Sequence, residues 1–412
     1  MNPPPRRRLG WKVFWALLTA IAAVVAGFAL WIHFLAEAKW QAMIRDVAKI
    51  REEVAAQRQA RRPDIAGDPL PGNSWEDYRQ ARRSLDQTSL ARRGKLPPEI
   101  PAKLLETAQN AAGEGLDRWK TGTRRQVAFF DWDWEGDQDL YQDWRTTEIW
   151  LLELPTARAR HLIKEGRLSD AAEWLLGVLR FTVDVTENTP FPSRNWRDQW
   201  SMGIRELLSE QNIPRDVLDR LERGLEAAEG HFQQNEACIL HSAEQLGAWL
   251  IREDPYYLMV SIGEYKVPIK PSWRHAWSMK LFKADAFLKF EYAARRVIEL
   301  RRAGGPITDP DLAFLRRDWD NRILRGFIEM LDESNGEELA PTMRLRLLRV
   351  AAHYRATGEV LELDDPYGGK LSHSLSGQGL KVWSRGSDRT SNQGVGDWVD
   401  REGKDVVLEV PR

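Results

Sequence analysis

One uninterrupted run of apolar residues constrains this chain more than any other feature. The run extends from Val13 to Leu35 and contains no formally charged side chain, with His33 as its only titratable residue. At a rise of about 1.5 Å per residue, such a helix is long enough to cross the roughly 30 Å of hydrocarbon in a bilayer. The sequence therefore predicts a transmembrane helix over residues 13–35.

The charges on either side of this run predict its orientation. Glu37 and Lys39 follow the run, whereas four basic residues precede it: Arg6, Arg7, Arg8 and Lys12. By the positive-inside rule, residues 1–12 form a cytoplasmic arm and the remaining chain lies on the other side of the membrane. We interpret the chain as a single-pass protein of the bacterial inner membrane, with its bulk in the periplasm and the lipid bilayer as its first partner. A cleaved signal peptide is the alternative, but its apolar core is usually shorter.

Composition narrows the class of protein further. The 412 residues leave room for two or three packed units beside the membrane segment. The 60 basic residues nearly balance the 61 acidic ones, so a nucleic acid partner is not expected. Cys238 is the single cysteine, which rules out an internal disulfide framework.

Hydrophobic periodicity predicts a mainly α fold beyond the span. Residues 36–62 place Trp40, Ile44 and Val47 near one face, which indicates an amphipathic stalk helix able to self-associate. Residues 63–357 form an α-helical ectodomain in this interpretation. Residues 358–412 are rich in Gly and Ser with short β-prone runs, which predicts a small antiparallel β module.

One segment of the ectodomain has the sequence pattern of a helical hairpin. In residues 157–181, Gly166 stands between two helical patterns, and Ala171 and Ala172 would let the second helix pack closely on the first. The segment resembles one tetratricopeptide-like (TPR-like) helix pair. No second copy follows at a fixed period, so we expect an irregular helical array.

The C-terminal motifs resemble those of the major pseudopilins of type II secretion. The pattern consists of Asp365-Pro366-Tyr367-Gly368, then Trp383-Ser384-Arg385-Gly386-Ser387-Asp388, then Asp405-Val406. The preceding helix, with Met343, Leu347, Val350 and Tyr354 on one stripe, resembles the helix that packs on the pseudopilin sheet. In contrast to that family, Gly10 is followed by Trp11-Lys12 and the span contains no carboxylate. The chain is therefore not expected to be a processed pilus subunit.

The layout as a whole resembles a group of uncharacterised bacterial envelope proteins. In that group a Leu-Asp-Trp-x-x-Gly-like segment precedes a Leu-Pro helix start and an Ala-rich helix pair. The matching residues here are Asp133-Trp134-Glu135-Gly136, Leu154-Pro155 and the hairpin at Gly166. This resemblance implies no activity.

Calcium is the one cofactor that the sequence suggests, at either of two places. The pseudopilin resemblance implies a calcium ion in the C-terminal loop, with Asp388 and Asp405 at the matching positions. A second, EF-hand-like register has its acidic members at positions 1, 3, 5 and 9: Asp131, Asp133, Glu135 and Asp139. Its twelfth position is Gln142 instead of a bidentate Glu, so an acidic helix start with Trp rings in the core is the favoured interpretation.

No constellation of residues predicts catalysis. The histidines are scattered without zinc-ligand spacing, and no nucleophile elbow or phosphate-binding loop is present. We therefore expect a non-catalytic interaction or scaffold protein of the envelope with one or more envelope protein partners. An accessory component of a type II secretion or pilus-like machine is the alternative. A cell-wall hydrolase with paired carboxylates among residues 131–143 is a third hypothesis.

Overall fold

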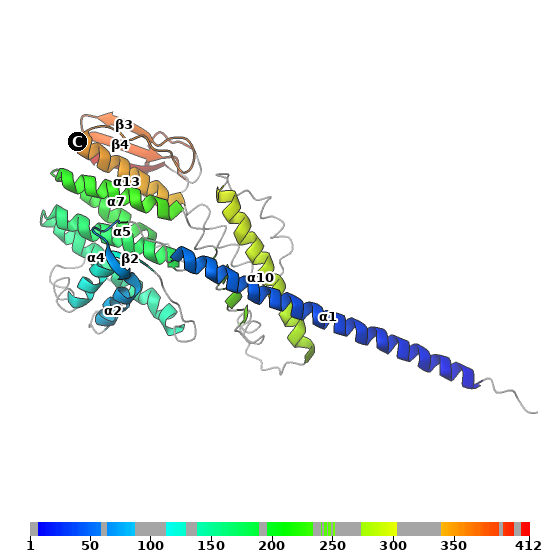
Figure 1. Cartoon of the computed structure of the whole chain (residues 1–412). Coiled ribbons are helices and arrows are strands. Elements are labelled where there is room, and N and C mark those ends of the chain that lie inside the picture. Colours follow the sequence, from blue (N-terminus) through cyan, green and yellow to red (C-terminus); the bar gives the residue numbers. More distant parts are fainter. Residues whose placement is uncertain are drawn as a thin grey trace, which may run out of the picture. The chain divides into compact units, whose positions relative to one another are not determined.

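The computed structural model describes residues 7–58, 64–86, 113–128, 138–188, 196–233, 240, 243–244, 246–248, 250–251, 273–302, 339–386, 390–398 and 405–412. Most of these residues are helical (Figure 1). The helices are α1 (Arg7–Arg58), α2 (Ser74–Asp86), α4 (Gln138–Lys164), α5 (Leu168–Asn188), α6 (Trp196–Leu208), α7 (Arg215–Gln233), α10 (Trp273–Arg302) and α13 (Leu339–Thr357), with a further helix over residues 113–122. The mainly α fold is thus confirmed.

Two small sheets accompany the helices. Parallel strands β1 (Leu70–Asn73) and β2 (Arg125–Val127) form the first. The C-terminal sheet has the order β3-β4-β6-β5, from β3 (Ser372–Ser376), β4 (Gly379–Ser384), β5 (Gly396–Asp397) and β6 (Asp405–Pro411). Strands β3, β4 and β6 are antiparallel as expected, whereas β5 runs parallel to β6. The purely antiparallel prediction is wrong there because β5 approaches the backbone of Asp405 through Gly396, where no Cβ fits.

The chain divides into two compact units. Unit 1 contains Met1–Glu52 and Ser242–Phe327, and unit 2 contains Glu53–His241 and Ile328–Arg412. These units differ from the linear order expected for a stalk over residues 36–62, a body over 63–357 and a module over 358–412. The difference arises because helices distant in sequence share one core, while residues adjacent in sequence need not.

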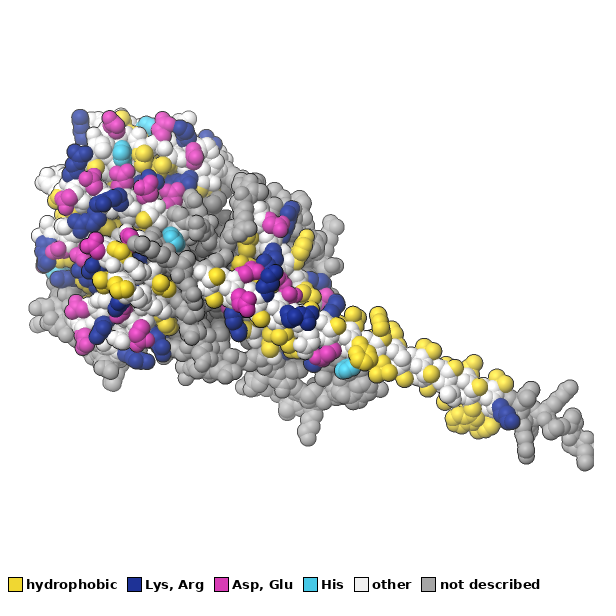
Figure 2. Space-filling view, in the orientation of Figure 1, with side chains coloured by type: hydrophobic (Ala, Val, Ile, Leu, Met, Phe, Trp, Pro, Cys, Tyr) yellow, Lys and Arg dark blue, Asp and Glu magenta, His cyan; other side chains and the backbone are white. Residues whose placement is uncertain are grey.

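Helix α1 changes character along its length. Val24 is 73% exposed, and the other large side chains from Trp11 to Phe34 that are exposed form an apolar surface (Figure 2). The helix is long and apolar enough to cross a membrane, and the rest of the protein does not bury its most apolar stretch. A signal sequence would also meet these criteria of length and apolar composition. From Ala36 onward one stripe is buried, with Met43, Val47 and Ile50 at 3% exposure or less.

Helix α10 contacts this part of α1 in unit 1. Lys280 Nζ donates to Glu37 Oε2 at 2.7 Å, and Lys39 Nζ lies 3.6 Å from Asp285 Oδ1. A Cβ on Gly247 would lie 2.2 Å from Val47 and 2.7 Å from the ring of Phe287, so three segments meet without spare room. Residues of this stripe are therefore in contact with other parts of the same chain. Self-association through the stalk over residues 36–62 stays a prediction.

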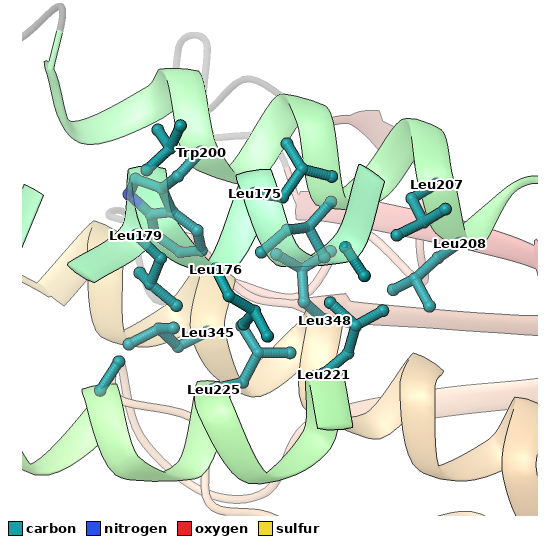
Figure 3. Packing of buried hydrophobic residues seen from close by; sticks show 14 of the residues in the cluster. Leu175, Leu176, Leu179, Trp200, Leu207, Leu208, Leu221, Leu225, Leu345 and Leu348 are labelled. Atoms are coloured by element: carbon teal, nitrogen blue, oxygen red, sulfur yellow. The ribbon is translucent and has the colours of Figure 1, made fainter. Parts of the chain in front are cut away.

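The core of unit 2 joins its helices to the C-terminal sheet. Helices α5, α6, α7 and α13 contribute buried leucines that interdigitate around Leu176 and Leu348 (Figure 3). Helix α13 packs on α7 with one side and on β4 and β6 with another. Residues 358–412 therefore continue the helical core instead of forming a separate one.

A ladder of ion pairs aligns α13 with α7. Arg346 Nε donates to Glu229 Oε1 at 2.6 Å, Arg349 pairs with Glu226 and Glu229, and His353 Nδ1 lies 3.0 Å from Glu222 Oε1. The three rungs follow helical spacing on both elements, because residues three or four positions apart face the same neighbour. The ladder therefore favours one antiparallel register of the two helices.

The predicted hairpin at Gly166 is present between α4 and α5. Gly166 has a φ of 72°, and its N–H donates to Ile163 O at 2.9 Å, as at helix ends closed by glycine. Ala171 and Ala172 are fully buried. The relation to tetratricopeptide repeats stays a prediction. The expected helix start at Leu154-Pro155 is wrong, since Pro155 lies inside α4 at the cost of one backbone hydrogen bond.

Candidate functional site in the C-terminal β module

Asp365 joins a tight turn to the end of β4. Its Oδ1 accepts hydrogen bonds from Ser384 Oγ at 2.8 Å and Tyr367 N at 3.0 Å, and its Oδ2 accepts one from Arg385 N at 2.9 Å. The carboxylate is 4% exposed. Two of the three motifs on which the pseudopilin resemblance rests thus meet at one buried carboxylate, which holds the turn and the strand together.

Asp405 holds the loop before β5 in a similar way. Its Oδ2 accepts hydrogen bonds from Asn392 N at 2.9 Å and Gly394 N at 2.7 Å. Gln393 and Gly394 have φ values of 58° and 77°, and this left-handed turn brings the N–H groups of Asn392 and Gly394 to the same carboxylate oxygen. At the start of β6, Asp405 is therefore placed to bind the backbone of this loop.

The second oxygen of Asp405 is the feature that points to a ligand. Asp405 is fully buried, and its Oδ1 has no hydrogen-bond partner within the part of the chain that the structure describes. A buried carboxylate oxygen without a partner is costly, and a hard cation would satisfy it. Asp405 therefore fits the calcium hypothesis as a ligand through Oδ1.

The remaining ligands of such an ion are not brought together by the described residues. Asp388 lies outside the described residues. Asp397, at the end of β5, is exposed, and its strand pairs with the first residues of β6. Where the structure describes the chain, no three His, Cys, Asp or Glu side chains gather closely enough to hold a metal ion. Calcium binding at Asp388 and Asp405 stays a prediction.

The loop that Asp405 holds is also anchored on the helical core. Trp398 is 2% exposed, and the guanidinium of Arg205 in α6 lies 5.8 Å from the centre of its ring. Trp398 belongs to the same buried cluster as the leucines of α5 to α7. A ligand at Asp405 would therefore act on a loop that connects the sheet to the helices.

The acidic segment proposed as an EF-hand-like site is only partly visible. Asp131, Asp133 and Glu135 lie outside the described residues. Asp139 and Gln142 fall within the first two turns of α4. The structure therefore neither assembles nor separates this ligand set, and the paired carboxylates of the hydrolase hypothesis have the same status.

A second buried polar cluster lies in the helical part of unit 2, and the sequence did not predict it. Tyr78 Oη donates to Asp184 Oδ2 at 2.8 Å, and Arg180 Nε donates to Asp184 Oδ1 at 2.9 Å. Arg180 also donates to the carbonyl of Arg125 at 2.7 Å. Arg180 and Asp184 stand four residues apart among apolar residues of α5, which was the one available signal. Their third member, Tyr78, comes from another helix.

The environment of Tyr78 is electrostatically unusual. Burial raises the pKa of the Tyr78 phenol well above its ordinary value of 10.0, and the charge of Asp184 adds to that rise. Phe181 packs edge-on against the Tyr78 ring at a centroid distance of 4.8 Å. All three polar side chains are at most 2% exposed. A substrate could not reach them without movement of the core, so the cluster serves packing and specificity.

Comparison with protein family models, with curated proteins and with solved structures gives no match for this chain. The pseudopilin resemblance therefore rests on its motif residues alone.

Proposed function

We propose that this protein is a non-catalytic, membrane-anchored interaction protein of the bacterial envelope, with a cytoplasmic N-terminus and its folded units in the periplasm. The continuity of α1 supports this most directly. The same helix has an exposed apolar part from Trp11 to Phe34 and, from Ala36, a part packed into unit 1. Because no loop separates the two parts, the anchor and unit 1 move as one body.

A cleaved signal sequence is the competing explanation of the apolar run. Ala36-Glu37-Ala38 has the small-x-small pattern of a cleavage site. However, Ala36 is 1% exposed and Glu37 is bound to Lys280, so cleavage after Ala38 would remove two residues that contribute to the packing of unit 1. This loss favours an uncleaved anchor.

Topology is tested with single cysteines in a Cys238→Ser background. Ser374→Cys lies on the exposed strand β3, and Asn2→Cys lies in the N-terminal arm. A membrane-impermeant maleimide added to spheroplasts should label the first variant directly and the second only after the membrane is permeabilised. Labelling of position 2 in intact spheroplasts would reverse the proposed orientation.

The interaction role is tested by crosslinking in the cell. A photo-reactive amino acid in place of Leu375, which is 58% exposed on β3, should give a reproducible adduct with an envelope protein. The same residue in place of Leu380, which is 2% exposed and faces the core, serves as the matched control. If neither position gives an adduct above background, and exposed positions on α7 and α10 give none, the interaction role is wrong.

A second candidate, accessory function in a secretion or pilus-like machine, is favoured by the buried Oδ1 of Asp405, which has no hydrogen-bond partner among the described residues. It predicts that calcium stabilises the loop before β6. Titration of the full chain with calcium should slow proteolysis in the C-terminal module, and Asp405→Asn should abolish that protection. Asp397→Asn is the control for a general loss of negative charge. Identical protease patterns with and without calcium would remove this support.

A further inference from the structure

Helix α10 crosses α1, and the contacts between the two helices follow the same chain direction (Figure 1). In the N-terminal to C-terminal direction of α1, Glu37 is bound to Lys280 and Lys39 pairs with Asp285. Further along, Val47 and Phe287 both pack against Gly247. The ammonium groups of Lys280 and Lys283 lie 5.8 and 6.0 Å from the ring centre of Trp40. In these pairs, higher residue numbers on α1 go with higher residue numbers on α10. Residues of α10 before Lys280 therefore extend toward the N-terminal, apolar part of α1 (Figure 1).

The level of these first residues follows from helix geometry. Seven residues separate Trp273 from Lys280, which corresponds to about 10 Å along the axis of α10. The same distance measured back along α1 from Glu37 ends near Trp31. The helices cross at an angle, so the rise along α1 is smaller than 10 Å. The first two turns of α10 therefore lie between the level of Trp31 and that of Glu37.

That level is the membrane interface if residues 13–35 span the bilayer. The polar headgroup region adds roughly 5 to 8 Å on each side of the hydrocarbon. Tryptophan is enriched there because its ring is apolar while its N–H can reach water and headgroups, and lysine and arginine extend their charges outward. The first two turns of α10 contain Trp273, Arg274, Trp277 and Lys280, and Trp31 of α1 is 59% exposed at the same level.

We propose that Trp273–Lys280 forms a second membrane contact, in which the first turns of α10 lie among the phospholipid headgroups and upper acyl chains beside the exit point of α1. Continuity with the exposed apolar surface of α1 favours lipid over a protein partner as the occupant. This inference rests on the proposed function, because it requires α1 to span the bilayer. Two contacts, at α1 and at α10, would set the tilt of unit 1 against the membrane.

Spin labels on the full chain in nanodiscs of phosphatidylethanolamine and phosphatidylglycerol test the depth of α10. In the Cys238→Ser background, one cysteine is placed at Arg274, Ala276 or Ser278; positions 276 and 278 lie on nearly opposite sides of the helix. Val24→Cys, at a 73% exposed position within the span, is the lipid reference. Tyr292→Cys, at a 56% exposed position twelve residues beyond Lys280 on the same helix, is the water reference.

The measured quantity is the accessibility of each label to oxygen relative to a water-soluble nickel complex. At least one of the three positions should give a ratio between those of Val24 and Tyr292 and several-fold above that of Tyr292. In that variant, replacing both Trp273 and Trp277 by Ser should lower the ratio toward that of Tyr292 while the helical circular dichroism stays unchanged.

Other results overturn the inference in distinguishable ways. Water-like ratios at all three positions with a lipid-like ratio at Val24 would refute the second contact and leave the proposed anchor intact. A water-like ratio at Val24 would refute both. Labels at residues 274–278 that are shielded from oxygen and nickel alike would show a protein contact in place of lipid.

Discussion

Breaking the buried ion pair of α5 should destabilise unit 2 more than any exposed substitution. Asp184→Leu leaves the guanidinium of Arg180, which is 2% exposed, without its carboxylate, and removes the acceptor of the Tyr78 hydroxyl. Removing one partner of a buried pair costs about 3 to 5 kcal/mol, and the lost hydrogen bond between Tyr78 and Asp184 adds about 1 kcal/mol. A whole domain is stable by only about 5 to 15 kcal/mol. The variant should therefore lose a large part of the stability of unit 2.

Hydrogen exchange measured by mass spectrometry on the full chain resolves this loss by unit. A loss of about 4 kcal/mol, the lower end of this range, should accelerate exchange of the slowest α5 amides by roughly a thousandfold, since each 1.36 kcal/mol is a factor of ten. Peptides of α10 in unit 1 should not change, which controls for general damage.

A compensating variant makes the reasoning refutable. In Arg180→Met with Asp184→Leu, no unpaired charge remains, and apolar replacement of a buried pair is often nearly neutral. Adding Tyr78→Phe also removes the hydroxyl that lost Asp184 as its acceptor. We expect the double variant to be more stable than Asp184→Leu alone, and the triple variant to be at least as stable as the double. Equal exchange rates in the single and double variants would show that the uncompensated charge is not the cause.

Three further predictions concern other parts of the chain. Because the pKa of Tyr78 is raised in the folded state, the unfolded chain loses the phenol proton at a lower pH than the folded chain does. The contribution of Tyr78 to the free energy of unfolding is therefore fully present below about pH 10 and falls as the pH rises further. In Tyr78→Phe, stability followed by circular dichroism should fall less steeply with alkaline pH. Gly396→Ala should detach β5 from β6, because its Cβ would lie 1.8 Å from Asp405 O, and Gly394 N should lose exchange protection; Gly377→Ala, with no atom within 4 Å of its Cβ, should leave that protection unchanged. Protein purified from membranes should have the intact mass of 47.5 kDa, whereas a mass lacking the first 38 residues would show that Ala36-Glu37-Ala38 is cleaved.

Some features of the fold could be predicted because their causes are local. The run from Val13 to Leu35 needs no neighbour to be apolar, and the helix pair around Gly166 follows from glycine at a left-handed turn and alanines at a close contact. The β-prone runs of the C-terminal residues likewise follow from the strand preference of Val, Leu and Trp. These elements are present in the structure.

In the candidate site, the sequence identified a residue but not its contacts. Asp405 was singled out by its motif, but the two backbone N–H groups that donate to its Oδ2 come from a loop that folds back at residues 392–394. Its buried Oδ1 has no hydrogen-bond partner among the described residues. The pairing of Tyr78 with Asp184 joins residues that are 106 positions apart. No periodicity encodes such a contact, because it depends on how two helices pack and not on either helix alone.

The sequence alone determined the apolar span, the helical class and the positions of several turns, because each follows from side chains within a few residues of one another. Only the tertiary structure decided which faces are covered. The stripe of α1 beyond Ala36, predicted as part of an amphipathic stalk helix, is buried within the chain, and Glu37 at its start is bound to Lys280, more than 200 residues away. The C-terminal sheet shares the core of α13. Burial is a property of distant surfaces brought together, and the free energy gained from it selects among arrangements that local patterns leave open.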